Sequence, residues 1–240
     1  MSRFALLLVM AAMALVSLGA ASPAPASAKL VTCTKLFFAV HEFDTLAKCW
    51  AGTPEVFFGK FRRREIAKGQ SAQITSSGGA FTLAATVGGV PVEVKCEKEK
   101  GSSELVGGEP ITGTTTMELT GCNAGTCKVS EPIKIEKAKV EVVAESEKFF
   151  YKLSPASGTV FTSIVLTGEC SAKGTYELTG TARSEIGAES STFGSGTGSK
   201  LTLKKGEKAG TATLLGKVTE TMVPLEKEEG FEELRFAFEK

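Results

Sequence analysis

Between residue 79 and residue 240, apolar and polar residues alternate with a period of two, which builds β-strands and not helices. The segment IKIEKAKVEVVA at 133–144 is the clearest case, because Ile and Val alternate there with Lys and Glu. Turn signals rich in Gly, Ser and Pro recur about every ten residues between such segments. This pattern confines the chain to folds made of many short antiparallel strands.

The predicted fold class is therefore all-β, with an antiparallel sandwich or barrel-like core stabilised by disulfides and a small N-terminal extension. Each sheet is expected to have one solvated and one buried face. Strands are expected at 81–85, 90–96, 111–121, 133–144, 149–153, 160–170, 175–184, 201–205, 212–223 and 234–238.

Residues 29–70 differ in composition from the rest of the chain. They contain the single Trp, the single His and two cysteines, and they are rich in Phe. We interpret them as a Cys-containing extension, with residues 71–240 forming a β-sandwich domain. Residues 69–79 are expected to link the two parts, and 187–199, rich in Gly and Ser, to form a flexible loop.

Residues 1–28 have the features of a secretory signal peptide. Arg3 provides the positive charge, residues 5–20 are apolar, and Ala26-Ser27-Ala28 fits the small-residue cleavage pattern. A membrane anchor would need about 20 apolar residues, more than this segment supplies. A lipid-attachment site at Cys33 is a weaker alternative, because Thr32 stands where a smaller residue is usual. The sequence predicts export, with no transmembrane segment after cleavage.

Six cysteines follow this segment, and an even number in an exported chain predicts disulfides. Cys122 and Cys127 flank a turn-like tetrapeptide, so we expect them to pair across a hairpin. Cys96 and Cys170 each end an alternating segment and are expected to form a second bridge. The remaining pair is then Cys33 with Cys49. A metal site is disfavoured by the loose spacing and the single His.

The composition argues against most catalytic and ligand chemistry. The chain has one His and one Asp, His41 and Asp44, and no nucleophile elbow accompanies them. Without Arg3 the 28 basic residues become 27, equal to the 27 acidic ones, which disfavours nucleic acid as a partner. We therefore expect no enzyme activity, no catalytic residue, no cofactor and no metal. A hydrolase that relies on Glu side chains remains an alternative.

A candidate binding surface is formed by aromatic residues. Phe150 and Tyr151 follow Phe149, and adjacent residues of a strand face opposite sides, so at least one of the three should face away from the core. Together with Trp50 they define a candidate platform for carbohydrate or cell-wall polysaccharide. The favoured hypothesis is an exported, non-enzymatic protein with a structural or binding role outside the cell or at its surface; its specific function and partner are unknown.

The middle of the chain resembles a group of small, secreted, β-rich actinobacterial proteins. The resemblance covers about residues 81–186 and rests on Cys96, the segment GGEPITGTTTMELTG at 107–121, Cys122, Cys127, LSPASGTVF at 153–161 and Cys170. It implies export, a core with four cysteines and a β fold. It implies no catalytic residue.

Overall fold

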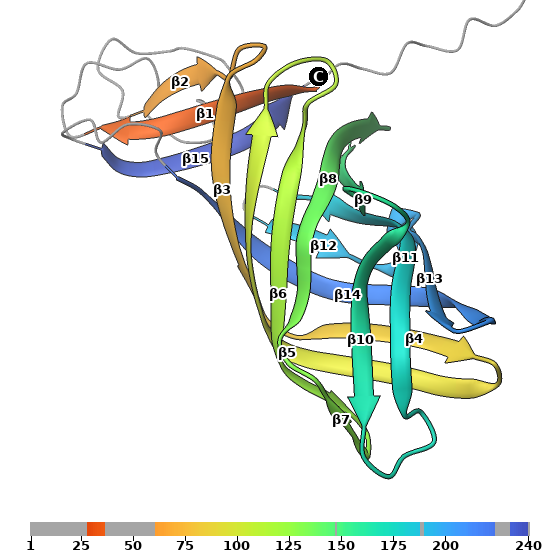
Figure 1. The fold of residues 1–240 in the computed structure, drawn as a ribbon. Helices are drawn as coiled ribbons and strands as arrows, with labels where there is room; N and C mark the ends of the chain where they lie inside the picture. The colour runs from red at the N-terminus through yellow and green to blue at the C-terminus, as the bar shows by residue number, and fades with distance from the viewer. Residues whose placement is uncertain (1–27, 37–60, 147, 188–189, 224–230, 240) are drawn as a thin grey trace, which may run out of the picture.

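The computed structural model describes residues 28–36, 61–146, 148–187, 190–223 and 231–239 (Figure 1). In these ranges the regular structure is almost entirely β-strand, which confirms the all-β prediction. None of the described residues belongs to a helix long and apolar enough to cross a membrane. The strands are β1 Lys29–Leu36, β2 Phe61–Glu65, β3 Ser71–Gly78, β4 Phe81–Val87, β5 Val90–Val106, β6 Thr112–Ala124, β7 Cys127–Val129, β8 Ile133–Glu145, β9 Lys148–Pro155, β10 Val160–Thr167, β11 Gly174–Ile186, β12 Ser190–Phe193, β13 Lys200–Lys205, β14 Lys208–Val223 and β15 Phe231–Glu239; a 3-10 turn covers Ser195–Thr197.

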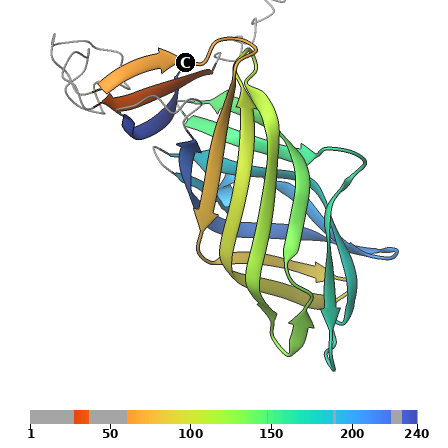
Figure 2. The ribbon, with the colours of Figure 1, turned by 60° about the vertical axis from the view of Figure 1, so that its left-hand side comes forward.

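The larger sheet curls until it closes on itself, which gives the barrel-like core. One closed ring, the upper ring, runs through β3, β5, β6, β8, β9, β11, β12 and β14, and β14 pairs with β3 again. Figure 2 shows β3, β5, β6 and β8 side by side in the wall of this ring. Because the ring is closed, each of its strands has a hydrogen-bonded neighbour on both sides along these segments.

A second closed ring, the lower ring, continues from the first. It runs through β4, β5, β6, β7, β10, β11, β13 and β14, and β14 pairs with β4. The four long strands β5, β6, β11 and β14 are therefore shared by both rings. Figure 1 shows β5 bending from the wall of the upper ring into its pairing with β4.

The bend coincides with a gap in the β5–β6 ladder. Register pairs run on both sides of Glu97 and Gly121, and these two residues are not paired with each other. Gly121 has a φ of 65°, in the left-handed region that glycine tolerates without a steric cost. Across this point the buried face of β5 changes from even-numbered residues, such as Cys96, to odd-numbered ones, such as Glu99. The bend therefore determines which side chains of β5 point into the interior.

Three strands form a separate small sheet in the order β15-β1-β2. The N-terminal extension thus pairs with the last strand of the chain, with Lys29 opposite Glu239. Phe238 of β15 contacts the rings of Phe149 and Tyr151, with centroids 5.9 and 5.8 Å away. This sheet packs against the upper ring through these aromatic contacts.

Disulfides are present, but the two pairings predicted for the core are wrong. Cys96 bonds to Cys122, and Cys127 bonds to Cys170. The reason is strand register: Cys96 lies directly opposite Cys122 on β5 and β6, whereas the residue opposite Cys127 is Ala124. These bonds indicate an oxidising environment.

Cys33 is also disulfide-bonded. Its predicted partner, Cys49, lies outside the described residues, so that pairing stays a prediction. The predicted signal peptide also falls almost entirely outside them, on residues 1–27.

Two segments predicted as linker and loop contain strands. β3 occupies most of the predicted linker at 69–79 and closes the upper ring against β14. β12 lies within the predicted loop at 187–199 and joins β11 to β14. Both are short and rich in Ser and Thr, so their sequence lacks the strong alternation of the other strands.

Candidate functional site: a polar cavity inside the upper ring

Two carboxylates enter the interior of the upper ring, where a barrel-like core is normally apolar. Glu99 lies on β5, opposite Gly78 of β3 and Leu119 of β6, and its exposed fraction is 2%. Glu220 lies on β14, directly opposite Ser76 of β3. Because opposite residues of a ladder face the same side, both carboxylates share the interior with the apolar core.

Glu220 is held by two hydroxyl groups from other strands. Ser191 of β12 donates a hydrogen bond to Oε1 over 2.9 Å, and Tyr151 of β9 donates one to Oε2 over 3.3 Å. Ser191 is 1% exposed and Tyr151 is 7% exposed. The carboxylate therefore crosslinks three strands of the ring from the inside.

Glu99 is only partly satisfied. Ser76 donates a hydrogen bond to its Oε1 over 2.9 Å, but its Oε2 is buried without a partner. Room for this side chain depends on Gly101 of the same strand. A Cβ there would lie 2.5 Å from Ser76 Oγ and 2.8 Å from Glu99 Oε1. Glycine at position 101 therefore leaves the space that the carboxylate of Glu99 occupies.

A cavity of about 30 Å³ lies beside Glu220 and Ser76, and we call it the polar cavity; Glu99 reaches it only through its hydrogen bond with Ser76. By volume it holds about two water molecules. Ser184 of β11 also lines it, is fully buried, and has an Oγ without a hydrogen-bond partner. The polar cavity is lined by Ser76, Ser103, Thr115, Met117, Val140, Tyr151, Leu153, Ser184, Ser191, Phe193, Val218 and Glu220.

Burial changes the protonation of this cluster. Loss of hydration raises the pKa of Glu220 to about 7, since the Glu99 carboxylate adds to the effect and the hydrogen bonds from Ser191 and Tyr151 only partly oppose it. Burial also raises the pKa of Glu99, against the hydrogen bond from Ser76. The pKa of Tyr151 is raised well above 10, first by burial and then by Glu220. Tyr151 is therefore a neutral donor at neutral pH.

Two apolar cavities of about 30 Å³ each continue from the polar cavity. The middle cavity shares Thr115, Met117, Leu153 and Phe193 with the polar cavity. The lower cavity shares Met117, Ile135, Leu178 and Leu214 with the middle one. Met117 lines all three, so the three spaces are neighbours along the inside of the core.

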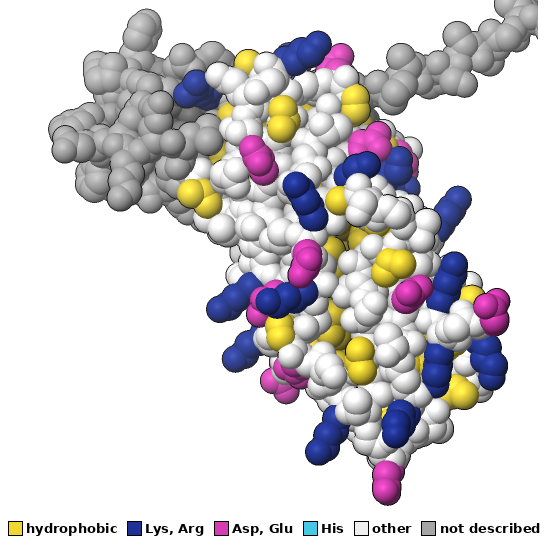
Figure 3. Space-filling view, in the orientation of Figure 1, with side chains coloured by type: hydrophobic (Ala, Val, Ile, Leu, Met, Phe, Trp, Pro, Cys, Tyr) yellow, Lys and Arg dark blue, Asp and Glu magenta, His cyan; other side chains and the backbone are white. Residues whose placement is uncertain are grey.

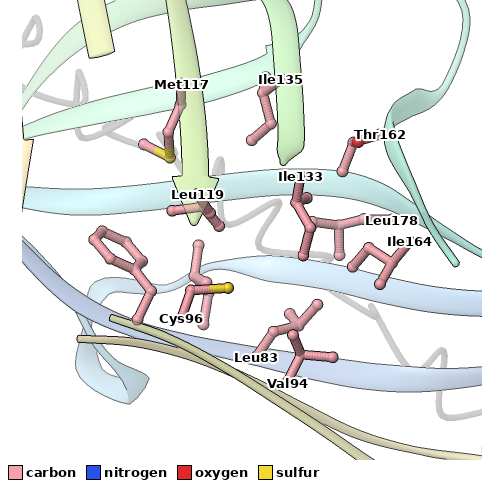
Figure 4. Close-up of a pocket in the computed structure, with 12 residues that line it drawn as sticks. Leu83, Val94, Cys96, Met117, Leu119, Ile133, Ile135, Thr162, Ile164 and Leu178 are labelled. Carbon is pink, nitrogen blue, oxygen red and sulfur yellow. The ribbon is translucent and has the colours of Figure 1, made fainter. Parts of the chain in front are cut away.

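The lower cavity reaches the surface between β6, β8 and β10. Met117, Leu119 and Ile135 line it and are only partly buried. Figure 4 shows these side chains with Ile133, Thr162 and Ile164 around the space. In Figure 3, which has the orientation of Figure 1, hydrophobic side chains are visible in a furrow in the middle of the molecule.

The predicted aromatic platform is not formed by the residues that the structure describes. Phe150 is 8% exposed and Tyr151 is 7% exposed, so neither offers an open ring face. Phe150 does face away from the ring interior, but the guanidinium of Arg183 lies 4.5 Å from its ring centre and covers it. Tyr151 faces inward to Glu220. Trp50, like His41 and Asp44, lies outside the described residues.

Sequence reasoning missed Glu99 and Glu220 as site residues. For Glu220 a signal existed: it shares its strand face with Val218 and Met222, both buried, so a period of two places it inside. For Glu99 no such signal was readable, because the buried face of β5 changes at the bend beside Glu97.

The described residues contain no group of three or more His, Cys, Asp or Glu that could hold a metal ion. No family model, curated protein or solved structure matches this chain. The arrangement itself, a buried and a half-buried carboxylate beside apolar space, is therefore the basis for any functional assignment.

Proposed function

We propose that this protein is exported and acts without catalysis, by binding a small apolar molecule inside its barrel-like core. The observation that carries the proposal is the row of neighbouring cavities that reaches the surface at the partly buried Met117, Leu119 and Ile135. Barrels of this size either fill their interior with side chains or hold one small ligand. Met117 is unbranched and adaptable, which suits a cavity that expands around a guest.

Export is supported by the signal-like residues 1–28 and by the disulfides of the core. A Glu-dependent hydrolase is the less favoured alternative. Its two carboxylates would have to face a sugar, but Glu99 does not line the polar cavity and both oxygens of Glu220 already accept hydrogen bonds from Ser191 and Tyr151. A carbohydrate-binding platform is also less favoured, because Phe150 and Tyr151 are buried.

Binding of the neutral fluorescent probe N-phenyl-1-naphthylamine to the full chain tests the proposal. We expect a saturable rise in fluorescence that 1-dodecanol reverses. Ile135→Phe should weaken probe binding about tenfold, since the added ring occupies the cavity opening. Leu215→Phe is the matched control, because Leu215 is 44% exposed and outside the three cavities, and it should bind as the native chain does.

Circular dichroism of both variants establishes that they are folded. If Ile135→Phe is not folded, Leu119→Phe at the same opening replaces it. Absence of saturable binding by the native chain would overturn the proposal, and so would equal affinities in the folded opening variant and the control.

A further inference from the structure

The charges around the polar cavity are one-sided. Glu220 lines it, Glu99 is hydrogen-bonded to the lining residue Ser76, and none of the ion pairs among the described residues includes either carboxylate. Those ion pairs lie on the outer surface, as in Lys134 with Glu118. Two neighbouring carboxylates without a cation are unfavourable in a poorly hydrated interior. The cluster is therefore complementary to a positive charge.

The hydrogen-bonding groups around the polar cavity also lack a partner that donates. The hydroxyls of Ser76, Ser191 and Tyr151 already donate to carboxylate oxygens. Two buried oxygens remain without partners: Glu99 Oε2, which can only accept when ionised, and Ser184 Oγ, which can accept as well as donate. A buried acceptor without a donor is unfavourable, and more so when it is charged. The missing component is a donor of several hydrogen bonds.

Size limits the class of donor. About 30 Å³ accommodates a group as small as one or two water molecules, which an –NH₃⁺ group matches. A guanidinium or a trimethylammonium group is larger, and a carboxylate would be repelled by Glu99 and Glu220. A primary ammonium has three N–H donors and a compact charge.

The two apolar cavities next to the polar cavity indicate what is attached to the ammonium group. Thr115, Met117, Leu153 and Phe193 separate the polar cavity from the middle apolar cavity and line both. From there the lower cavity leads to the surface between β6, β8 and β10. An unbranched hydrocarbon chain is the shape that follows such a narrow apolar course.

We propose that the polar cavity binds the ammonium group of a primary alkylamine beside Glu220 and Ser184, with Glu99 behind Ser76 adding negative charge, while the alkyl chain extends along the two apolar cavities, which widen around it at Met117. This inference rests on the proposed function and specifies its ligand class. The ammonium group would give the site its selectivity for amines over alcohols and carboxylates. The alkyl chain would add to the affinity by burying apolar surface.

Displacement of N-phenyl-1-naphthylamine from the full chain by dodecylamine, 1-dodecanol and dodecanoate at pH 8, all below their micelle-forming concentrations, tests the inference. Dodecylamine should displace the probe roughly 10- to 100-fold more effectively than 1-dodecanol, the range expected for charged hydrogen bonds in a buried site. Dodecanoate should be the weakest of the three.

The variant Glu99→Gln/Glu220→Gln should lose the preference for dodecylamine over 1-dodecanol and keep its affinity for the alcohol. Its matched control is Glu118→Gln/Glu185→Gln, which removes two carboxylates of the outer surface. That control should keep the preference. Ser184→Ala, which removes one acceptor, gives a second reading if the double Gln variant fails to fold, and should reduce the preference severalfold.

The outcomes separate the two proposals. If amine and alcohol displace the probe equally, or if the folded double Gln variant keeps the preference, the amine site is overturned and the apolar binding function stands. If the probe binds to the native chain but none of the three ligands displaces it, the amine site is overturned again. If the probe does not bind, the proposed function itself fails.

Discussion

The hydroxyl of Tyr151 donates a hydrogen bond to the carboxylate of Glu220 over 3.3 Å, although 69 positions separate the two residues in the sequence. The bond spans the inside of the upper ring, from β9 to β14. It lies next to the partly satisfied Glu99 and to the unpartnered Ser184. The polar centre of the core is thus assembled entirely from long-range contacts.

The free energy of unfolding should fall as the pH rises from about 4.5 to about 7. The folded pKa of Glu220 is about 7, above its ordinary 4.5, so the folded chain binds more protons in this interval. Its contribution is therefore fully present below pH 4.5 and is lost as the pH passes 7, by roughly 3 kcal/mol. The titratable groups that face it are Glu99 from β5, whose pKa is also raised, and Tyr151 from β9.

Urea unfolding between pH 4.5 and 8 measures this dependence. Glu220→Gln should flatten the profile and should exceed the native chain in stability at pH 8. Glu185→Gln, an exposed carboxylate paired with Lys148, should leave the profile unchanged. Parallel profiles for native chain and Glu220→Gln would contradict the burial of an ionisable group at this position.

Gly101→Ala should destabilise the protein by roughly 1–3 kcal/mol. The new Cβ would lie 2.5 Å from Ser76 Oγ, 2.7 Å from the carbonyl oxygen of Thr116 and 2.8 Å from Glu99 Oε1. Gly79→Ala is the control, since a Cβ at Gly79 meets nothing within 4 Å. Chemical denaturation of the two variants compares them, and an equal effect at both positions would refute the close packing around Glu99.

The disulfide between Cys127 and Cys170 joins residues 43 positions apart. Replacing both by Ser should lower the free energy of unfolding by roughly 4 kcal/mol, because the unfolded chain gains the freedom of an open loop. Equilibrium denaturation without reductant measures the loss. Peptide mapping of the native chain without reduction should give the Cys96–Cys122 and Cys127–Cys170 links, and recovery of Cys96 linked to Cys170 would disprove this arrangement.

Phe238→Ala should destabilise the protein by about 3 kcal/mol, the lower end for a buried Phe. The change removes the ring that contacts both Phe149 and Tyr151 and leaves space between the small sheet and the upper ring. Leu215→Ala is a suitable comparison because its side chain is exposed. Thermal unfolding of the two variants would show whether Phe238 carries this interface; equal melting temperatures would show that it does not.

The alternation of apolar and polar residues was sufficient to predict the fold class and most strands. The segment 133–144, for example, is strand β8 almost residue for residue. Ring closure was not predictable, because it depends on β3, whose sequence SAQITSSG carries only two apolar residues on its buried face, Ala72 and Ile74. Its partners on β14 lie far away along the chain.

The candidate site shows where single-sequence reasoning fails. Strand alternation predicted only that at least one of Phe149, Phe150 and Tyr151 faces away from the core. Phe150 does so, but the guanidinium of Arg183, on another strand, covers its ring, and no local pattern could show this. Glu220 could have been found from the strand period, whereas Glu99 could not, because the bend at Glu97 and Gly121 exchanges the two faces of β5. The wrong partner for Cys122 has a different cause, because the tight turn at Gly125 and Thr126 places Ala124, and not Cys122, opposite Cys127.

The pairing of β1 with β15 has a consequence for how the chain is made. During synthesis from the N-terminus, β1 emerges before the other described strands and its neighbour β15 emerges after them, so the small sheet cannot be completed while the ribosome still holds residues 231–239. The same delay applies to the upper ring, whose strand β3 awaits residues 218–223 of β14. Until then the backbone edges of β1 and β3 are open to other chains, so a nascent molecule of this protein is exposed to aggregation until β14 and β15 are released.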